Sequence, residues 1–291
     1  MANTLHLSYS GLPSQWISYP QVLGRRRPPL ASVKDPPVIE ARARRVPLRA
    51  AQLARYASVC GFTEGRSVPC TFLHVLAMPL HLKIFATSAF QLRPMGLIHL
   101  SNVIEVLAEP RAGDLLDVEV SARNYRETDA GLAFDMDTLI SGRNDQLWRE
   151  TCVFLSRWPE SPDRPAGRPP RPPRAPRDAT VLSQFEVTMR KVWEYARVSS
   201  DYNPIHLSDR AARYFGLRGA IAHGMWSLAR SLAQPPMPGY GPGTRIDAQF
   251  LTPVQLPAKV AIKEWREEGQ VKRALCDVRT GRVHMYACWV G

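Results

Sequence analysis

Short runs in which apolar and polar residues alternate, or β-branched and aromatic residues accumulate, occur in both halves of the chain. The runs cover residues 115–120, 132–136, 151–155, 259–263, 271–278 and 283–290. Such runs are typical of strands with one buried face. Gly269 and Gly281 fall between the last three runs and mark turns. The pattern predicts an antiparallel sheet in each half.

Each half also contains one apolar segment that follows a loop and is long enough for a helix. These segments are residues 75–85 and 223–233. A helix of about three turns wrapped by an antiparallel sheet buries the apolar faces of both elements. We therefore expect an α+β fold of the double hot-dog type, in which two such units pack side by side in one chain.

The two halves are also similar in sequence. Tyr56 and Tyr195 stand in similar surroundings, each preceded by a Val-x-x-Arg segment. If these tyrosines are equivalent, Phe62 occupies the position that Asp201 has in the second half. An internal repeat of this kind indicates duplication, with chance similarity as the alternative. Duplication predicts one active site in each chain, because the first half lacks the aspartate.

A stretch rich in proline and arginine, residues 164–177, separates the halves. Proline lacks an N–H donor and fixes φ, so this stretch should form an extended, exposed connector. It divides the chain into four parts. They are an N-terminal extension (1–35), an N-terminal hot-dog domain without catalytic residues (36–160), a linker (161–178) and a C-terminal hot-dog domain with the active site (179–291).

The formal net charge of +12 raises the question of binding to nucleic acid or phosphate. Much of the excess is arginine in two proline-rich stretches, 25–29 and 164–177, and not on a helix with interspersed aromatic residues. This position favours solvated connectors over a nucleic-acid site. Attraction of a phosphate-bearing small molecule stays open.

The cysteines and the hydropathy of the chain indicate which classes of protein it does not resemble. The five cysteines are widely spaced without a CxxC pair, so neither a disulfide framework nor a zinc site is indicated. The chain has no apolar run of about 18 residues, and its first residues lack the layout of a secretory signal. We expect a cytoplasmic protein without a membrane span.

The most informative segment begins at Asp201. It reads Asp201-Tyr-Asn-Pro-Ile-His206 and is followed by Ala222-His-Gly-Met225. These residues resemble the MaoC-like family of (R)-specific enoyl-thioester hydratases and 3-hydroxyacyl-thioester dehydratases, which includes double hot-dog members. The resemblance implies reversible hydration of trans-2-enoyl thioesters to (R)-3-hydroxyacyl thioesters in fatty-acid metabolism. It implies no metal or organic cofactor.

The chemistry of hydration fits these residues. It needs a base for the water proton, an acid for the α-carbon and a donor for the carbonyl oxygen. Asp201 and His206 are the expected catalytic pair, with one water held between them across a turn stiffened by Pro204. Asn203 can hydrogen-bond the backbone or orient a catalytic group. By resemblance, the N–H of Gly224 at the start of the central helix binds the thioester oxygen.

Two positions depart from the family pattern. Family members usually have glycine directly before the aspartate, where this chain has Ser200. A supporting serine on the central helix would fall at Leu232, with Ser231 one residue away, and such an offset turns a helical side chain by about 100°. His223 is expected to pack or cap the helix start, and the histidines of the first half to be structural.

Other functions stay open at this stage. Hot-dog folds also host thioesterases, so acyl-CoA hydrolysis is one alternative, and non-catalytic binding of acyl thioesters is another. The expected partner is an acyl thioester of coenzyme A or acyl carrier protein. A homodimer is left open.

Pro79 lies inside the first helical segment and has no N–H to donate. We expect it to kink or interrupt that helix. The space left would form a tunnel for the acyl chain, lined by Met78 and Met95. Asp201 is accordingly expected to face the first domain.

Overall fold

The computed structural model describes residues 4–25, 27–63, 67–143, 145–159, 174–235 and 241–290. Most of the expected linker, residues 161–173, lies outside these described residues. The four-part division of the chain therefore stays a prediction.

The N-terminal half begins with three elements that have no counterpart among the described residues of the C-terminal half. They are β1 (Thr4–Tyr9), α1 (Gln15–Gly24) and the short 3-10 helix η1 (Leu30–Ser32). The half continues with β2 (Val38–Pro47), α2 (Ala50–Cys60), α3 (Cys70–Ala86), β3 (Ile98–Val106), β4 (Leu115–Thr128), β5 (Gly131–Ser141) and β6 (Gln146–Arg157).

The C-terminal half follows the same plan with two additional short helices. Its elements are β7 (Thr180–Val187), α4 (Met189–Ser199), α5 (Pro204–Leu207), α6 (Asp209–Tyr214), α7 (Gly224–Leu232), β8 (Arg245–Phe250), β9 (Ala258–Glu267), β10 (Gln270–Asp277) and β11 (Val283–Val290). All six runs predicted to be strands fall on strands, namely β4, β5, β6, β9, β10 and β11.

The eleven strands of the described ranges form one sheet in the order β1-β2-β4-β5-β6-β3-β8-β11-β10-β9-β7. The two halves meet where β3 pairs with β8 in an antiparallel register. Outward from this junction, the first half runs β3, β6, β5, β4, β2 and the second runs β8, β11, β10, β9, β7. Each half thus repeats the same strand order, which agrees with the duplication inferred from the sequence.

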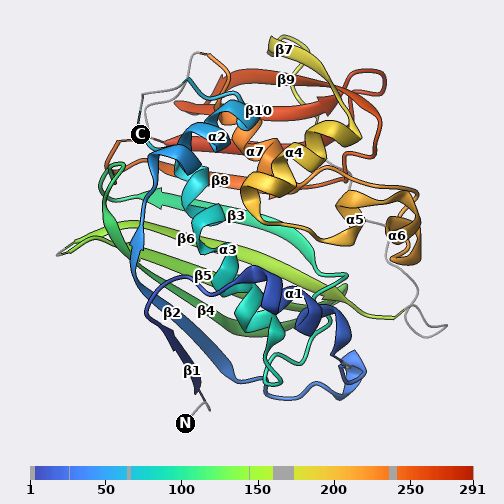
Figure 1. The fold of residues 1–291 in the computed structure, drawn as a ribbon. Coiled ribbons are helices and arrows are strands. Elements are labelled where there is room, and N and C mark those ends of the chain that lie inside the picture. Colours follow the sequence, from blue (N-terminus) through green and yellow to red (C-terminus); the bar gives the residue numbers. More distant parts are fainter. Residues whose placement is uncertain are drawn as a thin grey trace.

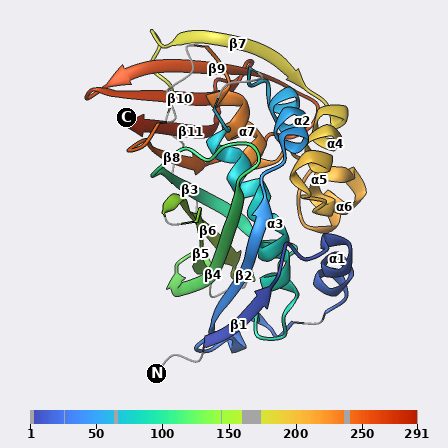
Figure 2. The ribbon, with the colours of Figure 1, turned by 60° about the vertical axis from the view of Figure 1, so that its left-hand side comes forward.

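The sheet curves around the central helices α3 and α7, and α1, α2, α4, α5 and α6 lie on the same side (Figures 1 and 2). Apolar side chains from both halves form one main core cluster. This is the predicted hot-dog arrangement, present twice in one chain. None of the described helices combines the length and the apolar character that crossing a bilayer requires.

Helix α3 corrects one expectation. It runs without a break from Cys70 to Ala86 although Pro79 lies inside it, so the predicted interruption is wrong. Most of its residues are buried in the common core, and a cavity beside its first turn measures about 10 Å³. That volume is far too small for an acyl chain, and the tunnel expected from Pro79 stays a prediction.

The equivalence of Tyr56 and Tyr195 is visible in the packing of α2 against α4. The two rings are fully buried and face each other with centroids 6.2 Å apart. Each tyrosine lies five positions before a C-cap residue with left-handed backbone, Gly61 (φ 82°) in α2 and Ser200 (φ 61°) in α4. Phe62 therefore stands at the position of Asp201, as the sequence comparison predicted.

Residues 4–25 are integrated into the fold. Strand β1 extends the sheet by pairing in parallel with β2. Helix α1 packs on α3 and buries Ser18, Tyr19 and Val22, while Trp16, Ile17 and Leu23 are exposed. Figure 1 shows α1 beside the lower part of α3, on the side from which α5 and α6 project.

Gly61 provides a test of the left-handed turn. A Cβ at this position would lie 1.9 Å from Nη1 of Arg230. A residue that replaces Gly61 would also have to keep the positive φ of this turn. We expect Gly61→Ala to lower the free energy of unfolding by about 1–2 kcal/mol, measured by urea denaturation. Gly11→Ala is the control, because a Cβ there meets no atom within 4 Å. Equal stability of the two variants would contradict the prediction.

Candidate functional site

The loop after α4 carries the expected catalytic aspartate and connects it to the next helix. The Oδ1 of Asp201 accepts a hydrogen bond from the backbone N–H of Asn203 at 3.1 Å. The Oδ1 of Asn203 in turn accepts from the N–H of Ile205 at 3.4 Å and caps α5. Pro204 is the first residue of that helix, where its missing N–H costs nothing. Two side-chain turns in succession therefore fix how far Asp201 lies from α5.

Helix α5 carries His206 with its ring directed back at Asp201. The Nδ1 of His206 lies 2.9 Å from the carbonyl oxygen of Ile221, to which it donates. In a neutral imidazole only one ring nitrogen carries a proton, so Nε2 of His206 is an acceptor. This Nε2 lies 3.9 Å from Oδ2 of Asp201. The side chains are 10% and 27% exposed respectively, so the pair is mostly buried but open to a small ligand.

His223 packs directly against this pair. Its ring stacks on that of His206 with centroids 3.8 Å apart, and its Nε2 donates to the backbone carbonyl of Asp201 at 3.1 Å. Burial, together with the adjacent His206, lowers the pKa of His223 to about 3. His223 is therefore neutral at physiological pH and serves as a donor that supports the aspartate loop.

Gly224 follows His223 and begins α7. Among the described residues its N–H donates to no backbone carbonyl outside the helix, as is usual for the first residue of a helix. A Cβ at this position would come within 3.0 Å of the ring of Phe250. Glycine therefore lets that ring approach the backbone, and the helix start presents an amide with positive partial charge.

The surroundings of Asp201 and His206 lower the pKa of both side chains, so that near neutral pH one is charged and the other is not. Burial raises the pKa of Asp201, but His223, His206 and the N–H of Asn203 outweigh it, so the pKa lies below its ordinary value. Burial lowers the pKa of His206 by more than the charge of Asp201 raises it. At neutral pH the site thus holds an ionised carboxylate next to a neutral imidazole.

The donor set of the site suits proton transfer better than metal binding. Asp201, His206 and His223 present nitrogen and oxygen atoms within 4.8 Å of one another. However, the Nδ1 of His206 and the Nε2 of His223 are both engaged with backbone carbonyls. Only one histidine nitrogen and the carboxylate then face a common point, and a protein metal site usually needs three or more ligands.

The serine discussed from the sequence does not support the aspartate. Ser231 is fully buried, and its Oγ has no hydrogen-bond partner among the described residues. Leu232 is fully buried in the core. The carboxylate of Asp201 is oriented instead by the N–H of Asn203, which the motif already contained.

A residue that the sequence gave no reason to select, Tyr19 of α1, contacts the same loop. Its hydroxyl donates to the carbonyl of Ser200 at 2.8 Å and accepts from the N–H of Tyr202 at 2.6 Å. Because 181 residues separate Tyr19 from Ser200 in the chain, no local pattern could have revealed the contact. The loop that carries Asp201 therefore contacts the N-terminal extension, whereas the expectation concerned the first hot-dog domain.

The first half contains a buried polar cluster of its own. The Nδ1 of His74 lies 2.9 and 3.0 Å from the carboxylate oxygens of Glu150, which also accepts from Asn102 at 2.5 Å. The Sγ of Cys152 lies 3.8 Å from the same nitrogen. His81 bonds to Thr138 at 3.1 Å. These contacts agree with the structural role expected for the histidines of this half.

The cluster is strongly polarised. Burial lowers the pKa of His74, but the charge and hydrogen bonds of Glu150 outweigh it, and the net shift is upward. Burial raises the pKa of Glu150, but His74 and Asn102 outweigh it, and the net shift is downward. The pair is therefore ionic in the folded protein. The His74 cation also helps to lower the pKa of Asp201.

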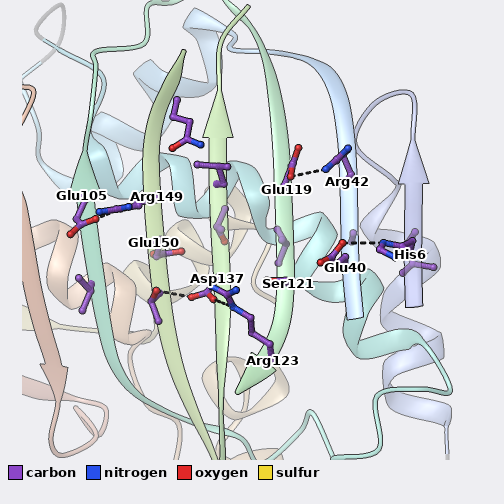
Figure 3. Close-up of a pocket in the computed structure, with 18 of the residues that line it drawn as sticks. His6, Glu40, Arg42, Glu105, Glu119, Ser121, Arg123, Asp137, Arg149 and Glu150 are labelled. Carbon is purple, nitrogen blue, oxygen red and sulfur yellow. Dashed lines mark hydrogen bonds and ion pairs between the residues drawn. The ribbon is translucent and has the colours of Figure 1, made fainter. Parts of the chain in front are cut away.

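A groove of about 1010 Å³ lies elsewhere, on the face of the sheet turned away from α3 (Figure 3). Its charged side chains pair with one another across neighbouring strands. The pairs are Arg42 with Glu119 at 2.9 Å, His6 with Glu40 at 3.0 Å, Arg245 with Glu105 at 2.6 Å, Arg123 with Asp137, and Arg149 with Glu105. None of the four predicted site residues lines it, so the groove is separate from the site described above.

Comparisons with known proteins identify the family to which this chain is similar. The MaoC like domain family matches residues 166–286. The chain is 32% identical over 243 residues to the 3-hydroxyacyl-thioester dehydratase X of Mycobacterium tuberculosis (strain ATCC 25618 / H37Rv), covering 83% of this chain and 85% of that protein.

Solved structures of MaoC-like and double hot-dog proteins are similar to this chain in fold. The crystal structure of HtdX of M. tuberculosis is similar with a TM-score of 0.73 and 30% identity, over 87% of this chain and 99% of that one. A MaoC-like dehydratase from Phytophthora capsici has a TM-score of 0.66 and 17% identity, over 90% and 97% of the two chains. A double hot-dog protein of M. tuberculosis has a TM-score of 0.55 and 12% identity, over 90% and 97%. The last two similarities concern the fold alone.

The His74–Glu150 ion pair predicts a pH-dependent contribution to stability. Glu150→Gln should lower the free energy of unfolding by about 3 kcal/mol near pH 6, because it leaves His74 buried without its counter-ion. The raised pKa of His74 gives stability that is present below pH 6.5 and is lost as pH rises through the folded pKa. The lowered pKa of Glu150 gives stability that is present above pH 4.5 and is lost as pH falls.

The difference between wild type and Glu150→Gln should therefore be largest near pH 5–6.5 and should narrow on both sides, as measured by urea unfolding from pH 3.5 to 9. Glu119→Gln, which breaks the exposed pair with Arg42, is the control and should change stability by less than about 1 kcal/mol. A difference for Glu150→Gln that stays constant with pH would refute the ionic pair.

Proposed function

The chain belongs to the MaoC-like family of dehydratases, and from that premise we propose that Asp201 and His206 catalyse its hydratase/dehydratase reaction on acyl thioesters. One observation carries the assignment. The Nε2 of His206, which is an acceptor because Nδ1 donates to Ile221, faces Oδ2 of Asp201 at 3.9 Å. This gap is longer than a direct hydrogen bond, and a water molecule beside it can contact both atoms.

In the hydration direction, the pair holds the attacking water. His206 accepts a proton from the water as its oxygen bonds to the β-carbon of the enoyl thioester. The carboxylate of Asp201 stabilises the imidazolium that forms. The electron pair of the double bond moves toward the thioester carbonyl, and the α-carbon then takes up one proton from the pair. One water is added in total, and the site returns to its starting protonation state.

The developing negative charge lies on the thioester oxygen. The N–H of Gly224 is the donor proposed for that oxygen, because it is the first amide of α7 and has no backbone partner in the described part of the chain. In the dehydration direction the same groups act in reverse order. The pair removes the α-proton and protonates the hydroxyl that leaves the β-carbon.

Asn203 is proposed to hold the geometry. Its side chain caps α5, and its N–H binds Asp201, so both catalytic groups depend on it. The second half alone has these groups, and Phe62 takes the place of Asp201 in the first half. One site per chain is therefore proposed. Coenzyme A or acyl carrier protein as the carrier, a cytoplasmic location and a homodimer stay predictions from the sequence.

The catalytic pair can be tested by substitution. Asp201→Asn and His206→Ala should each lower kcat for hydration of a trans-2-enoyl-CoA by at least about a hundredfold, since general acid–base groups commonly contribute that much. Loss of the enoyl absorbance measures the rate, and circular dichroism checks the fold. Asp129→Asn and His6→Ala, both exposed and outside the site, are matched controls. Hydration by either catalytic variant within threefold of wild type would sink the assignment.

The protonation states predict the acid side of the pH profile. The reaction needs neutral His206, and burial holds the pKa of His206 below 6.5. Asp201 is ionised throughout, because its pKa lies below 3.8. We expect kcat/KM to be level around pH 7–8 and to fall only below pH 6.5 as His206 takes up a proton. A midpoint above pH 6.5, measured with protein shown to be folded at each pH, would contradict this protonation scheme.

A further inference from the structure

The helices α2 and α4 end in equivalent left-handed turns that are closed in different ways. In α2 the turn is closed by the helix itself. The N–H groups of Gly61 and Phe62 both donate to the carbonyl of Ala57, at 2.7 and 2.9 Å. Glycine also adopts the positive φ of this position without a steric penalty.

In α4 neither condition holds. The residue with positive φ is Ser200, whose Cβ makes this backbone conformation unfavourable. The described residues show no bond from Ser200 or Asp201 to the carbonyl of Ala196, which is the equivalent of Ala57. The N–H of Asp201 donates instead to Oγ of Ser199 at 3.2 Å. No backbone bond of the kind that closes the α2 turn therefore closes the turn that presents Asp201, and within α4 only the Ser199 side chain contacts it in the described residues.

Tyr19 contacts this turn from outside α4. Its hydroxyl donates to the carbonyl of Ser200 and accepts from the N–H of Tyr202, at 2.8 and 2.6 Å. These two groups belong to the peptide units on either side of the Asp201 Cα. A single oxygen thus fixes both peptide planes that carry the catalytic side chain.

The tyrosine is itself well anchored. It is 8% exposed, and α1, on which it lies, packs along α3. Its ring meets that of Tyr202 edge to face with centroids 6.0 Å apart, and Trp16 contacts the same ring at 5.2 Å. Burial, together with the charge of Asp201, raises the pKa of Tyr19, so its hydroxyl keeps its proton and stays a donor.

We propose that Tyr19 is a positioning residue for catalysis, which holds the Ser200–Tyr202 backbone so that the Asp201 carboxylate faces His206. The N-terminal extension is then a working part of the active site. This inference rests on the proposed role of Asp201. It also accounts for serine at a turn that its counterpart in the first half makes with glycine, because the two bonds to Tyr19 offset the unfavourable backbone conformation.

The test removes only the hydroxyl. In the full chain, Tyr19→Phe should lower kcat for hydration of a trans-2-enoyl-CoA about tenfold and change KM by less than twofold, since a small displacement of a catalytic group slows chemistry more than binding. Tyr125→Phe is the matched control. It also removes a buried tyrosine hydroxyl, but one without a hydrogen-bond partner in the described residues, and it should keep wild-type kcat. A kcat for Tyr19→Phe within twofold of wild type would overturn the proposal.

A double-mutant cycle separates positioning from a general structural effect. If Tyr19 acts through Asp201, then Tyr19→Phe should cause no further loss in the Asp201→Asn background. A loss that multiplies with that of Asp201→Asn, or a kcat loss matched by an equal loss of folded protein, would assign Tyr19 a structural role only.

Hydrogen exchange of the Tyr202 amide gives a readout that does not depend on activity. In wild type this N–H should be protected by its bond to Tyr19, and Tyr19→Phe should speed its exchange at least about tenfold while Tyr125→Phe leaves it unchanged. Unchanged protection of the Tyr202 amide in Tyr19→Phe would refute the proposal that the Tyr19 hydroxyl holds this loop. If wild-type protein hydrates no enoyl thioester but the Tyr202 amide loses protection in Tyr19→Phe, then the proposed function is wrong, whereas Tyr19 still holds the Ser200–Tyr202 backbone.

Discussion

The backbone conformation at the end of α4 is the constraint on which the site depends. A left-handed residue reverses the chain there, so that Asp201 leaves the helix and its carboxylate can accept the N–H of Asn203. The same turn sets the start of α5 and therefore the position of His206. A non-glycine residue in this conformation costs about 1–2 kcal/mol, which surrounding bonds have to offset. In this protein those bonds come from the other end of the chain, through Tyr19.

Burial determines the protonation states of the site. His206 and His223 are stacked and mostly enclosed, and in such surroundings a charged imidazole is disfavoured. Asp201 stays ionised because histidines and a backbone N–H stabilise its charge. At neutral pH the site therefore holds a neutral imidazole and a carboxylate, which are the forms that the proposed reaction requires. A more exposed site would leave His206 closer to half protonation near pH 6.5.

The two halves share a strand order but differ in the polar residues that they bury. The second half keeps the aspartate, the histidine and the glycine at the helix start. The first half has Phe62 at the position of Asp201 and supplies a buried ion pair, His74 with Glu150, whose cation acts on the charge of Asp201. Pairing of β3 with β8 joins the halves into one sheet, and α3 contacts α4 and α7 of the second half.

The sequence by itself determined the strands β4 to β6 and β9 to β11, the two central helical regions, the duplication and the family. It also selected Asp201, Asn203, His206 and Gly224, because these lie in one short segment whose spacing carries the pattern. Local patterns encode such features, since they depend on residues that are neighbours in the chain.

The tertiary structure decided what depends on distant contacts. Pro79 did not interrupt α3, because the helix is enclosed by the core, and packing outweighed the loss of one hydrogen bond. The orientation of the Asp201 carboxylate came from Asn203 and not from a serine on α7. The bonds from Tyr19 to a loop 181 residues away exist only because α1 docks on α3 beside that loop. No periodicity along the chain encodes such a contact, since it is fixed by how complete elements pack in three dimensions.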